Sequence, residues 1–363
     1  MKEWRLVKKA YDTPQSYDIL KILGYCKSIG EIEELKPTVQ LTAGFDRNWI
    51  TLGYYQDVDR DVKLENCKKF NIPVIRRWFA GMGSTFGGKW PMVYQAISTK
   101  EDFPTADETY RKVVGGVMHN TLRNLGVDSE YIPPNDCRVH HKKIVGGTTA
   151  LYGDLRYVAC FTNLSLPDMD MAVEVLNITP DKFKDKFIKE FRSYVGTIEI
   201  DGTRKVTPDE VMNSLAKEHE RIFNAKLIPE EWTEEEMKIC DKYYKIIDSE
   251  DYLFRNSTNR FLEKNKGYRT GFHQEKYRKL FQCTVAIDKK SLIKDIMLAG
   301  DFEMVPPQLD EEITLKLKGV NSMNLDVISA AVSEVIKPGY EIIGASVEEI
   351  AKVVHEASKK ATT

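Results

Sequence analysis

The sequence predicts a mixed α/β protein in which a large domain is followed by a smaller α+β domain. Its 363 residues exceed the usual size of one compact domain. β-rich runs and amphipathic helices both occur before residue 250, and the remaining chain shows two strand patterns followed by two helix patterns. We place the large domain at residues 1–255, a linker at 256–269 and the small domain at 270–363.

Several short elements are predicted near the start of the large domain. Residues 38–45 and 49–55 are rich in β-forming residues and flank a polar turn, which predicts a hairpin or two adjacent strands. A short helix follows around residues 62–70. The apolar run 72–75 then predicts a buried strand that ends in a glycine-rich loop.

The middle of the large domain combines a long helix with further strands. Apolar residues recur at three- and four-residue steps over 106–125, which predicts a helix with one buried face, and Gly126 suits its C-terminal end. A second β-rich region covers residues 144–166. Capped helix starts follow at Thr179-Pro180, Thr207 and Thr233.

The small domain is predicted from four elements beyond a polar junction. Residues 249–269 show no apolar periodicity, so the junction lies there. Strands are predicted over 280–287 and 292–299, and helices over 327–335 and 346–357. A two-layer α+β arrangement accommodates these elements.

The composition excludes several classes of protein. Hydrophobic residues make up 42% and charged residues 30%, which is typical of a folded, water-soluble chain. The 53 basic and 55 acidic residues leave a net charge of −2, so no overall field attracts nucleic acid or an anionic membrane. No apolar run reaches the roughly 18 residues of a membrane helix, and the N-terminus lacks the apolar segment of a signal peptide. We therefore expect a cytoplasmic protein without nucleic-acid or membrane partners.

The first candidate for chemistry is an arginine pair at a strand end. Arg76 and Arg77 lead into a glycine-rich stretch that contains Gly81 and Gly83. Glycine lets the backbone approach a ligand closely, and arginine supplies a permanent charge with several donors. An anion-binding loop and a glycine-rich hairpin both fit, because the stretch matches neither a P-loop nor a dinucleotide fingerprint.

The second candidate is the lysine pair Lys142-Lys143, which directly precedes an apolar strand containing Gly146. One of the two lysines must point along or into the sheet, and lysine is seldom buried without a partner. Such a lysine is a candidate ligand for a carboxylate or a phosphate. A solvated turn of polar residues is the alternative.

The order and spacing of five segments resemble the lipoate-protein ligase family, part of the biotin/lipoate ligase superfamily, over nearly the whole chain. The segments are GYYQDVDRDV at 53–62, VIRRWFAGMGSTF at 74–86, TADETYRKVV at 105–114, NDCRVHHKKIVGGTTA at 135–150 and YRTGFHQEKYRKLFQCTVAIDKKSLIKDIMLAGDF at 268–302. No single segment is sufficient to indicate the family, whereas five segments in this order are. The resemblance implies a class II synthetase/biotin-ligase-like catalytic domain with mixed and antiparallel sheets flanked by helices, followed by an accessory domain.

The resemblance also implies an activity. The large domain would activate lipoate, or a similar acyl acid, with ATP and Mg²⁺ to an acyl-adenylate. It would then transfer the acyl group to a lysine of an acceptor lipoyl domain or an H-protein-like protein. A similar acid is included because Phe79 and Val145 stand where the family pattern has serine.

By the same resemblance, Lys143 takes the place of the essential lysine and would stabilise negative charge during both steps. Arg77, supported by Arg76, would bind the same anionic centre. The remaining residues implied at the ATP and acyl site are Gly81, Gly83, Asn135, Asp136 and Gly146, with Asp136 also a candidate Mg²⁺ ligand. Candidates to line a slot for the acyl tail, or equally to form core, are Trp78, Phe79, Trp90 and Tyr94.

Two rival functions remain open at this point. One is ATP-independent octanoyl or lipoyl transfer through a cysteine nucleophile, for which Cys160 would be activated beside Lys143. The six cysteines are otherwise scattered and are expected to be reduced core residues. The other rival is a non-catalytic homologue that binds a lipoyl-like ligand.

Overall fold

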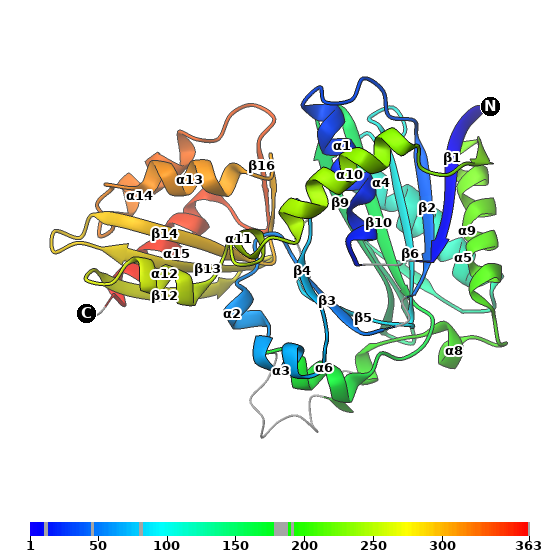
Figure 1. Ribbon diagram of the computed structural model, residues 1–363, viewed down its shortest axis with the longest axis horizontal. Helices are drawn as coiled ribbons and strands as arrows, with labels where there is room; N and C mark the ends of the chain where they lie inside the picture. Colours follow the sequence, from blue (N-terminus) through cyan, green and yellow to red (C-terminus); the bar gives the residue numbers. More distant parts are fainter. Residues whose placement is uncertain (11–13, 45–46, 80–82, 178–187, 190–191, 362–363) are drawn as a thin grey trace. The chain divides into compact units, whose positions relative to one another are not determined.

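The computed structural model describes two compact units (Figure 1). It describes residues 1–10, 14–44, 47–79, 83–177, 188–189 and 192–361. Unit 1 comprises Met1–Thr51, Glu65–Trp78 and Phe86–Ile247, and unit 2 comprises Leu52–Leu64, Phe79–Thr85 and Asp248–Thr363. None of the described helices has the length and apolar composition needed to cross a bilayer.

An eight-stranded mixed sheet forms the centre of unit 1, in the order β11-β1-β2-β6-β10-β9-β8-β7. The strands are β1 (Lys2–Ala10), β2 (Thr38–Ala43), β6 (Pro91–Thr99), β7 (Glu130–Ile132), β8 (Asp136–Val139), β9 (Lys142–Tyr152), β10 (Leu155–Asn163) and β11 (Ala225–Pro229). β1 runs parallel to β2 and β11, and the other neighbours are antiparallel. The mixed α/β class predicted from the sequence is confirmed.

Helices cover both faces of this sheet (Figure 1). One face is covered by α4 (Ala106–Lys112), the π-helical segment η2 (Val113–Met118), α5 (His119–Asn124) and α9 (Pro208–Phe223). On the other face α1 (Ile19–Ser28) contacts β6, β9 and β10, and α10 (Glu234–Ile247) packs on α1. Burial on both faces explains why the β9 residues Ile144 and Val145 are adjacent, apolar and both inaccessible to solvent.

The locally encoded helix predictions are confirmed. The helix expected over 106–125 is continuous through α4, η2 and α5, and Gly126 follows it with φ +83°. Thr207 forms a capping box with Glu210, and Thr233 exchanges hydrogen bonds with Glu236. Thr179-Pro180 lies outside the described residues. The shorter helices of unit 1 are η1 (Pro14–Asp18), α3 (Leu64–Lys69), α6 (Met169–Val175) and α8 (Ile198–Asp201).

The β-rich runs 38–45 and 49–55 both form strands, but they do not pair as a hairpin. β2 is hydrogen-bonded on both sides, to β1 and to β6, so it offers no free edge to β3 (Trp49–Leu52). β3 instead lies between β4 (Val74–Arg76) and β5 (Thr85–Gly87) in a separate three-stranded sheet. The strand expected at 72–75 is therefore β4, displaced by about two residues.

A tight turn joins β8 to β9. Val139 pairs with Lys142, and the two residues between them, His140 and His141, have φ 47° and 67°. Two consecutive positive φ values are the signature of a type I′ hairpin turn, for which Asn-Gly is the preferred sequence. Two histidines are therefore held in a backbone region that disfavours their side chains.

Replacing His140 with Asn and His141 with Gly should stabilise unit 1. We expect a gain of about 1 kcal/mol in the free energy of unfolding, because the new residues adopt positive φ at lower cost. This corresponds to a rise of about 2–4 °C in Tm, measured by calorimetry. The matched control is His140→Ala with His141→Ala, which should lower Tm. An equal Tm in both double variants would contradict the turn assignment.

Unit 2 contains the two-layer α+β module predicted from the sequence. Its antiparallel sheet has β12 (Arg269–Lys276), β13 (Leu280–Ile287) and β14 (Ile293–Gly300), and β15 (Glu303–Val305) pairs with β16 (Glu341–Ile343). The helices α13 (Leu309–Leu317), α14 (Leu325–Ser333) and α15 (Val347–Lys359) form the second layer. The two strands and two helices expected from the sequence are present, and β12 and α13 are additional.

The residues expected to form a linker, 256–269, are instead part of the folded unit 2. They include α12 (Thr258–Lys264), and α11 (Glu250–Leu253) precedes it. Asp57, just before α2 (Val58–Asp61), accepts a hydrogen bond of 3.1 Å from the backbone N–H of Thr258. This bond adds to the local cap of α12, in which Ser257 Oγ accepts a hydrogen bond of 3.1 Å from the Arg260 N–H. Phe261 is the only buried residue of α12, so the helix shows no apolar periodicity, which explains why the local pattern at 249–269 resembled a loop.

Candidate functional site

Lys143 and Asp136 meet on the hairpin formed by β8 and β9. Lys143 Nζ lies 2.7 Å from Asp136 Oδ1, and the two side chains are 31% and 16% exposed. Lys143 is therefore a cation at an accessible place, held by one carboxylate. Lys142 diverges from it, because its Nζ lies 3.2 Å from Asp201 Oδ1.

A β-bulge directs Lys143 toward Gly146. Cys137 pairs with Val145 and Arg138 with Lys143, so Ile144 is an extra residue on β9. Strict alternation would place residues 143 and 146 on opposite faces, and the extra residue brings them to the same face. A Cβ at position 146 would lie 2.7 Å from Lys143 Cε and 2.9 Å from its Nζ. Gly146 therefore provides the space that the lysine side chain occupies.

Asn135, which precedes β8, is hydrogen-bonded to Gly147 of β9. Its Nδ2 donates to the Gly147 carbonyl at 2.6 Å, and the Gly147 N–H donates to the Asn135 carbonyl at 2.7 Å. The amide donor is thus used within the hairpin. Asn135 supports the geometry of Lys143 rather than extending toward a ligand.

Strand register defines which residues share the face of the sheet that carries Lys143, here called the site face. Gly146 pairs with Asp136 on β8 and with Phe161 on β10, and Phe161 pairs with Val93 on β6. Tyr17 packs against these paired residues, and its ring centroid lies 5.6 Å from that of Phe161 and 4.9 Å from that of Trp49. The sequence patterns did not identify this apolar cluster beside the lysine, which consists of Tyr17, Trp49, Val93 and Phe161. The strand residue that pairs with Gly146, Phe161, would have pointed to it.

Tyr94 lies on the opposite face, here called the core face, so its assignment to the acyl slot is corrected. It pairs with Cys160, which pairs with Gly147, and it is fully buried under the helices. The hydroxyl of Tyr94 and His219 Nδ1 form a hydrogen bond of 2.7 Å. The alternation of β6 decides this outcome, because residues 93 and 94 must face opposite sides of the sheet.

His219 should make the stability of unit 1 depend on pH. Burial lowers the pKa of His219 to about 3, below the roughly 6.5 of an unfolded chain. Between these values the unfolded state binds more protons, so the free energy of unfolding falls as pH falls below about 6.5. At about pH 5 the loss should be about 2 kcal/mol relative to neutral pH. Thermal unfolding of the wild type and of His219→Gln tests this, since the variant should lose that part of the pH dependence; identical pH profiles would contradict it.

The arginine pair and its neighbours are buried in unit 1. Arg76 is 0% exposed and Arg77 8%, and Arg77 interacts electrostatically with Asp18 and Lys21. The Trp78 ring packs edge-on against Tyr25 of α1 and Tyr243 of α10, at 5.5 and 5.1 Å. Trp78 is therefore a core residue between two helices.

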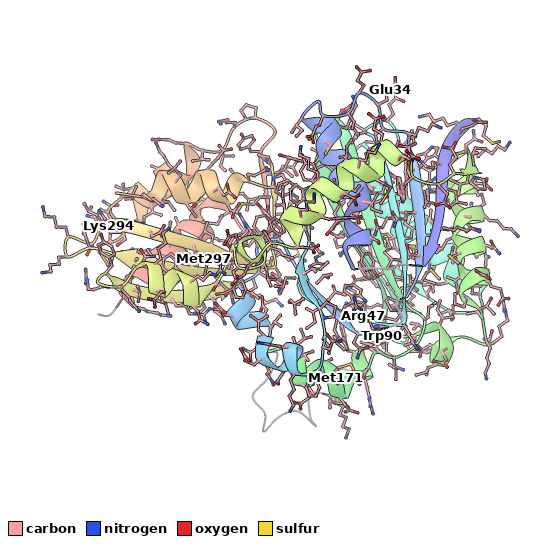
Figure 2. All side chains as sticks on the ribbon, in the orientation of Figure 1. Glu34, Arg47, Trp90, Met171, Lys294 and Met297 are labelled. Carbon is pink, nitrogen blue, oxygen red and sulfur yellow. The ribbon has the colours of Figure 1, made fainter. Side chains whose placement is uncertain are left out.

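The other loop candidates are placed as follows. Trp90, labelled in Figure 2, packs against Phe86 with ring centroids 5.3 Å apart. Phe79 belongs to unit 2, where its ring lies 5.1 Å from that of Tyr54. A Cβ at Gly83 would meet no atom within 4 Å among the described residues, so space alone does not require glycine there. Gly81 lies outside the described residues.

A sequence profile described as "Lipoyl protein ligase A/B catalytic domain" matches residues 31–220, which include the whole hairpin of Lys143. The chain belongs to this family. The family resemblance inferred from the five segments is thereby confirmed.

Relatives in this family carry the names of two activities. The chain is 26% identical over 209 residues to "Lipoate-protein ligase A subunit 1" of Thermoplasma acidophilum, covering 54% of this chain and 76% of that protein. It is 25% identical over 278 residues to "Lipoate--protein ligase 1" of Staphylococcus aureus, covering 74% and 78%. It is 21% identical over 233 residues to "Octanoyltransferase LipM" of Bacillus subtilis, covering 56% and 82%.

Solved structures of the family share the fold. P. falciparum LipL1 in complex with lipoate matches with a TM-score of 0.66 at 14% identity, over 97% of this chain and 99% of that one. A bipartite lipoate protein ligase from Thermoplasma acidophilum, studied with its E2 lipoyl domain, matches at 0.59 and 23% identity, over 70% and 98%. Lipoate-protein ligase A bound with ATP matches at 0.56 and 21% identity, over 70% and 99%. At these identities the likeness establishes the fold alone.

The cysteine thiols of this chain are not exposed at the site. All six are buried. Cys160 lies on the core face, and burial raises the pKa of its thiol well above the ordinary value. Burial likewise raises the pKa of Cys137 to about 12. A nucleophilic cysteine needs an accessible thiolate, so the assignment of Cys160 as an alternative nucleophile is corrected.

Asp136 does not fit the expected role of Mg²⁺ ligand. Its Oδ1 is engaged by Lys143, and Arg138 Nη2 lies 3.9 Å from Oδ2. Among the described residues no group of three or more His, Cys, Asp and Glu side chains could hold a metal ion. We therefore assign Asp136 the role of holding the lysine.

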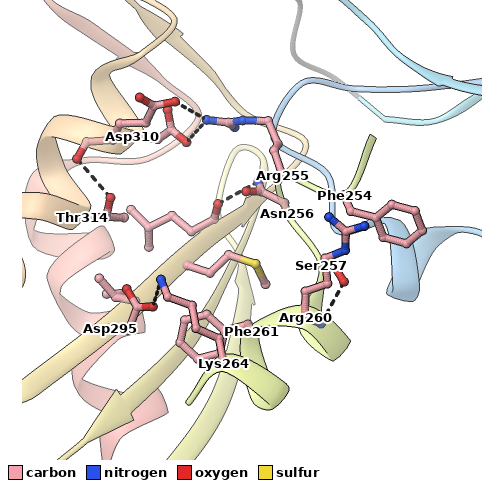
Figure 3. A pocket seen from close by; sticks show the side chains of 14 residues that line it. Phe254, Arg255, Asn256, Ser257, Arg260, Phe261, Lys264, Asp295, Asp310 and Thr314 are labelled. Carbon is pink, nitrogen blue, oxygen red and sulfur yellow. Dashed lines mark hydrogen bonds and ion pairs between the residues drawn. The ribbon is translucent and has the colours of Figure 1, made fainter. Parts of the chain in front are cut away.

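Unit 2 contains a cavity of about 320 Å³ whose charged groups are paired within the unit (Figure 3). Arg255 Nη2 lies 3.1 Å from Asp310 Oδ2 and 2.9 Å from Glu311 Oε1, and its guanidinium stacks on the Tyr54 ring at 3.9 Å. Lys264 Nζ lies 2.7 Å from Asp295 Oδ2. The stacking of Arg255 on Tyr54 connects the wall of this cavity to the segment 52–64.

Proposed function

We propose that the chain is a lipoate-protein ligase that uses ATP to activate lipoate and transfers the lipoyl group to a lysine of an acceptor lipoyl domain. In the first step a lipoate carboxylate oxygen attacks the α-phosphate of ATP, forming lipoyl-adenylate and releasing pyrophosphate. In the second step the acceptor amine attacks the adenylate carbonyl and AMP leaves. Relatives named as ligases, and family structures with lipoate, ATP or an E2 lipoyl domain, support this proposal.

The choice of a ligase over a transferase rests on the solvent exposure of Lys143 compared with that of the cysteine thiols. Lys143 is accessible and held by Asp136, whereas all six thiols are buried. Acyl transfer through a cysteine needs a thiolate in contact with the acyl donor. Adenylate chemistry needs a fixed positive charge beside the carboxylate and the α-phosphate, which Lys143 supplies. The apolar cluster beside Lys143 supports an acyl chain as substrate.

The test incubates the full chain with lipoate, ATP, magnesium and an apo lipoyl domain from the same source. We expect pyrophosphate release and a mass gain of one lipoyl group on the acceptor. A parallel reaction supplies octanoyl-acyl carrier protein without ATP, and Cys160→Ser is assayed in both. ATP-independent transfer that is lost in Cys160→Ser would establish the transferase instead. No product in either reaction, with lipoate binding retained, would establish a binding protein.

A further inference from the structure

The second step of the proposed reaction brings another protein to Lys143. The acceptor amine must reach the acyl carbonyl that the first step forms beside this lysine, so the surface of the acceptor must touch the residues that surround Lys143. Two surface segments of unit 1 lie directly beside it, namely the β8–β9 turn and residues 194–201, which end in α8. These segments are therefore placed where an acceptor can be recognised.

Residues 194–201 are attached to the strand that carries Lys143. Val195 and Lys143 form a parallel β-bridge, and the Gly196 N–H donates to the Lys143 carbonyl at 2.8 Å. A Cβ at Gly196 would lie 2.7 Å from Val139 Cγ1, so the segment packs closely on the hairpin. The turn and this segment thus form one continuous surface next to the lysine.

The segment 194–201 exposes two large apolar side chains. Tyr194 is 48% exposed and Ile200 is 58% exposed, whereas Ile198 is buried. Asp201, next to Ile200, is fixed to the hairpin because its Oδ1 lies 3.2 Å from Lys142 Nζ. A single exposed apolar residue is ordinary, but two in one short segment beside the lysine, one of them a tyrosine, are typical of a protein interface.

The β8–β9 turn exposes two histidines in a strained backbone. His140 and His141 are exposed and have φ 47° and 67°. Asn-Gly would form the same turn with less strain, so stability alone does not account for the two imidazoles. Strain of this kind is concentrated at functional sites. The ring N–H groups of the histidines can donate to carbonyl or carboxylate oxygens of another protein.

We propose that the β8–β9 turn and residues 194–201 recognise the acceptor protein. The surface that they form, here called the acceptor surface, consists of His140, His141, Tyr194 and Ile200. This inference rests on the proposed function and adds to it the residues that select the protein substrate. The acceptor is a folded protein whose target lysine lies near an apolar side chain, which packs on Tyr194 and Ile200, and near oxygen atoms that accept hydrogen bonds from the histidines. The acceptor surface acts in the second step, because the first step takes place without the acceptor.

Two variants test the acceptor surface. Ile200→Ser removes an exposed apolar side chain at no cost to the core. The double variant His140→Asn with His141→Gly removes both imidazoles and introduces residues that suit the turn. Each variant changes a surface that the acceptor contacts and leaves Lys143 and Asp136 in place.

Ile29→Ser is the matched control for Ile200→Ser. Ile29 is 53% exposed and directly follows α1. The neighbouring Ser28 lies beside the β9–β10 turn, where a Cβ at Gly153 would be 3.4 Å from Ser28 Cβ. This turn is at the other end of β9 from Lys143, roughly 30 Å along the strand. The control therefore removes the same exposed side chain far from the acceptor surface.

Pyrophosphate release without acceptor measures the first step, and the mass gain of an apo lipoyl domain measures the second. Both variants should release pyrophosphate at the wild-type rate, whereas their KM for the apo lipoyl domain should rise about tenfold or more. The histidine double variant should show this rise even though its Tm increases. Ile29→Ser should match the wild type in both steps.

A wild-type KM for the apo lipoyl domain in both variants would overturn the proposal, and so would loss of pyrophosphate release as large as the loss of transfer. A second copy of this chain as the occupant would appear in light scattering as a dimer that Ile200→Ser dissociates, which would also overturn it. If the wild type releases no pyrophosphate, the proposed function fails. Calorimetric binding of the apo lipoyl domain to the wild type and the variants then still decides whether the acceptor surface recognises it.

Discussion

Lys143→Ala is expected to lower the rate of acyl-adenylate formation about 10²–10³-fold, the usual cost of removing one preorganised charge-stabilising donor. The lysine is the accessible cation on the hairpin and lies 2.7 Å from Asp136. The ion pair is partly solvated, so its loss should change the free energy of unfolding by no more than about 1 kcal/mol. Pyrophosphate release and thermal unfolding measured on the same preparation test both statements.

Lys142→Ala is the matched control for this prediction. Lys142 is the neighbouring residue, carries the same charge and is also paired with an aspartate, but it contacts Asp201 rather than Asp136. Adenylate formation should be close to the wild-type rate. Equal loss of activity in the two variants would indicate a general effect of positive charge and would contradict the role assigned to Lys143.

Gly146→Ala is expected to reduce adenylate formation about 10–100-fold by moving the lysine and not by unfolding the protein. The new Cβ would lie 2.7 Å from Lys143 Cε and 2.9 Å from its Nζ, which is too close for both to stay in place. The displaced atoms are the end of a flexible side chain, so the structure can adapt at small cost. A displacement of about 1 Å at a catalytic group can cost about 10²-fold in rate.

Gly147→Ala provides the contrast at the next position. Its Cβ would lie 2.9 Å from Val114 Cγ2, in the core on the other side of the sheet. Overpacking of this kind should cost about 1–3 kcal/mol in the free energy of unfolding. Tm and pyrophosphate release measured for both variants should show activity lost at 146 and stability lost at 147. Activity that merely follows Tm in both would refute the steric role of Gly146.

Much of the fold could be predicted from the sequence because its signals are local. The helix over 106–125 and the capping boxes at Thr207 and Ser346 depend on residues within a few positions of one another. The pairing of 38–45 with 49–55 was wrong because partners distant in the chain compete for each strand edge. The helix α12 was missed because Phe261 is its only buried residue, so it carries no apolar periodicity.

The candidate site divides in the same way. Lys143, Asp136 and Gly146 lie within one short segment, so a motif could select them together. Tyr94 and Cys160 were assigned to the site, but both lie on the core face. Their orientation depends on the phase of each strand and on the bulge at Ile144, which no local pattern reveals.

The sequence by itself determined the family, the mixed α/β class and the lysine on which the proposed chemistry depends. Only the tertiary structure decided that Asp136 holds that lysine and that the thiols are excluded. Motifs and helix caps depend on residues that are close in sequence, whereas these contacts join strands and helices that are far apart in the chain. Their geometry follows from sheet register and burial, which exist only once the whole unit has packed.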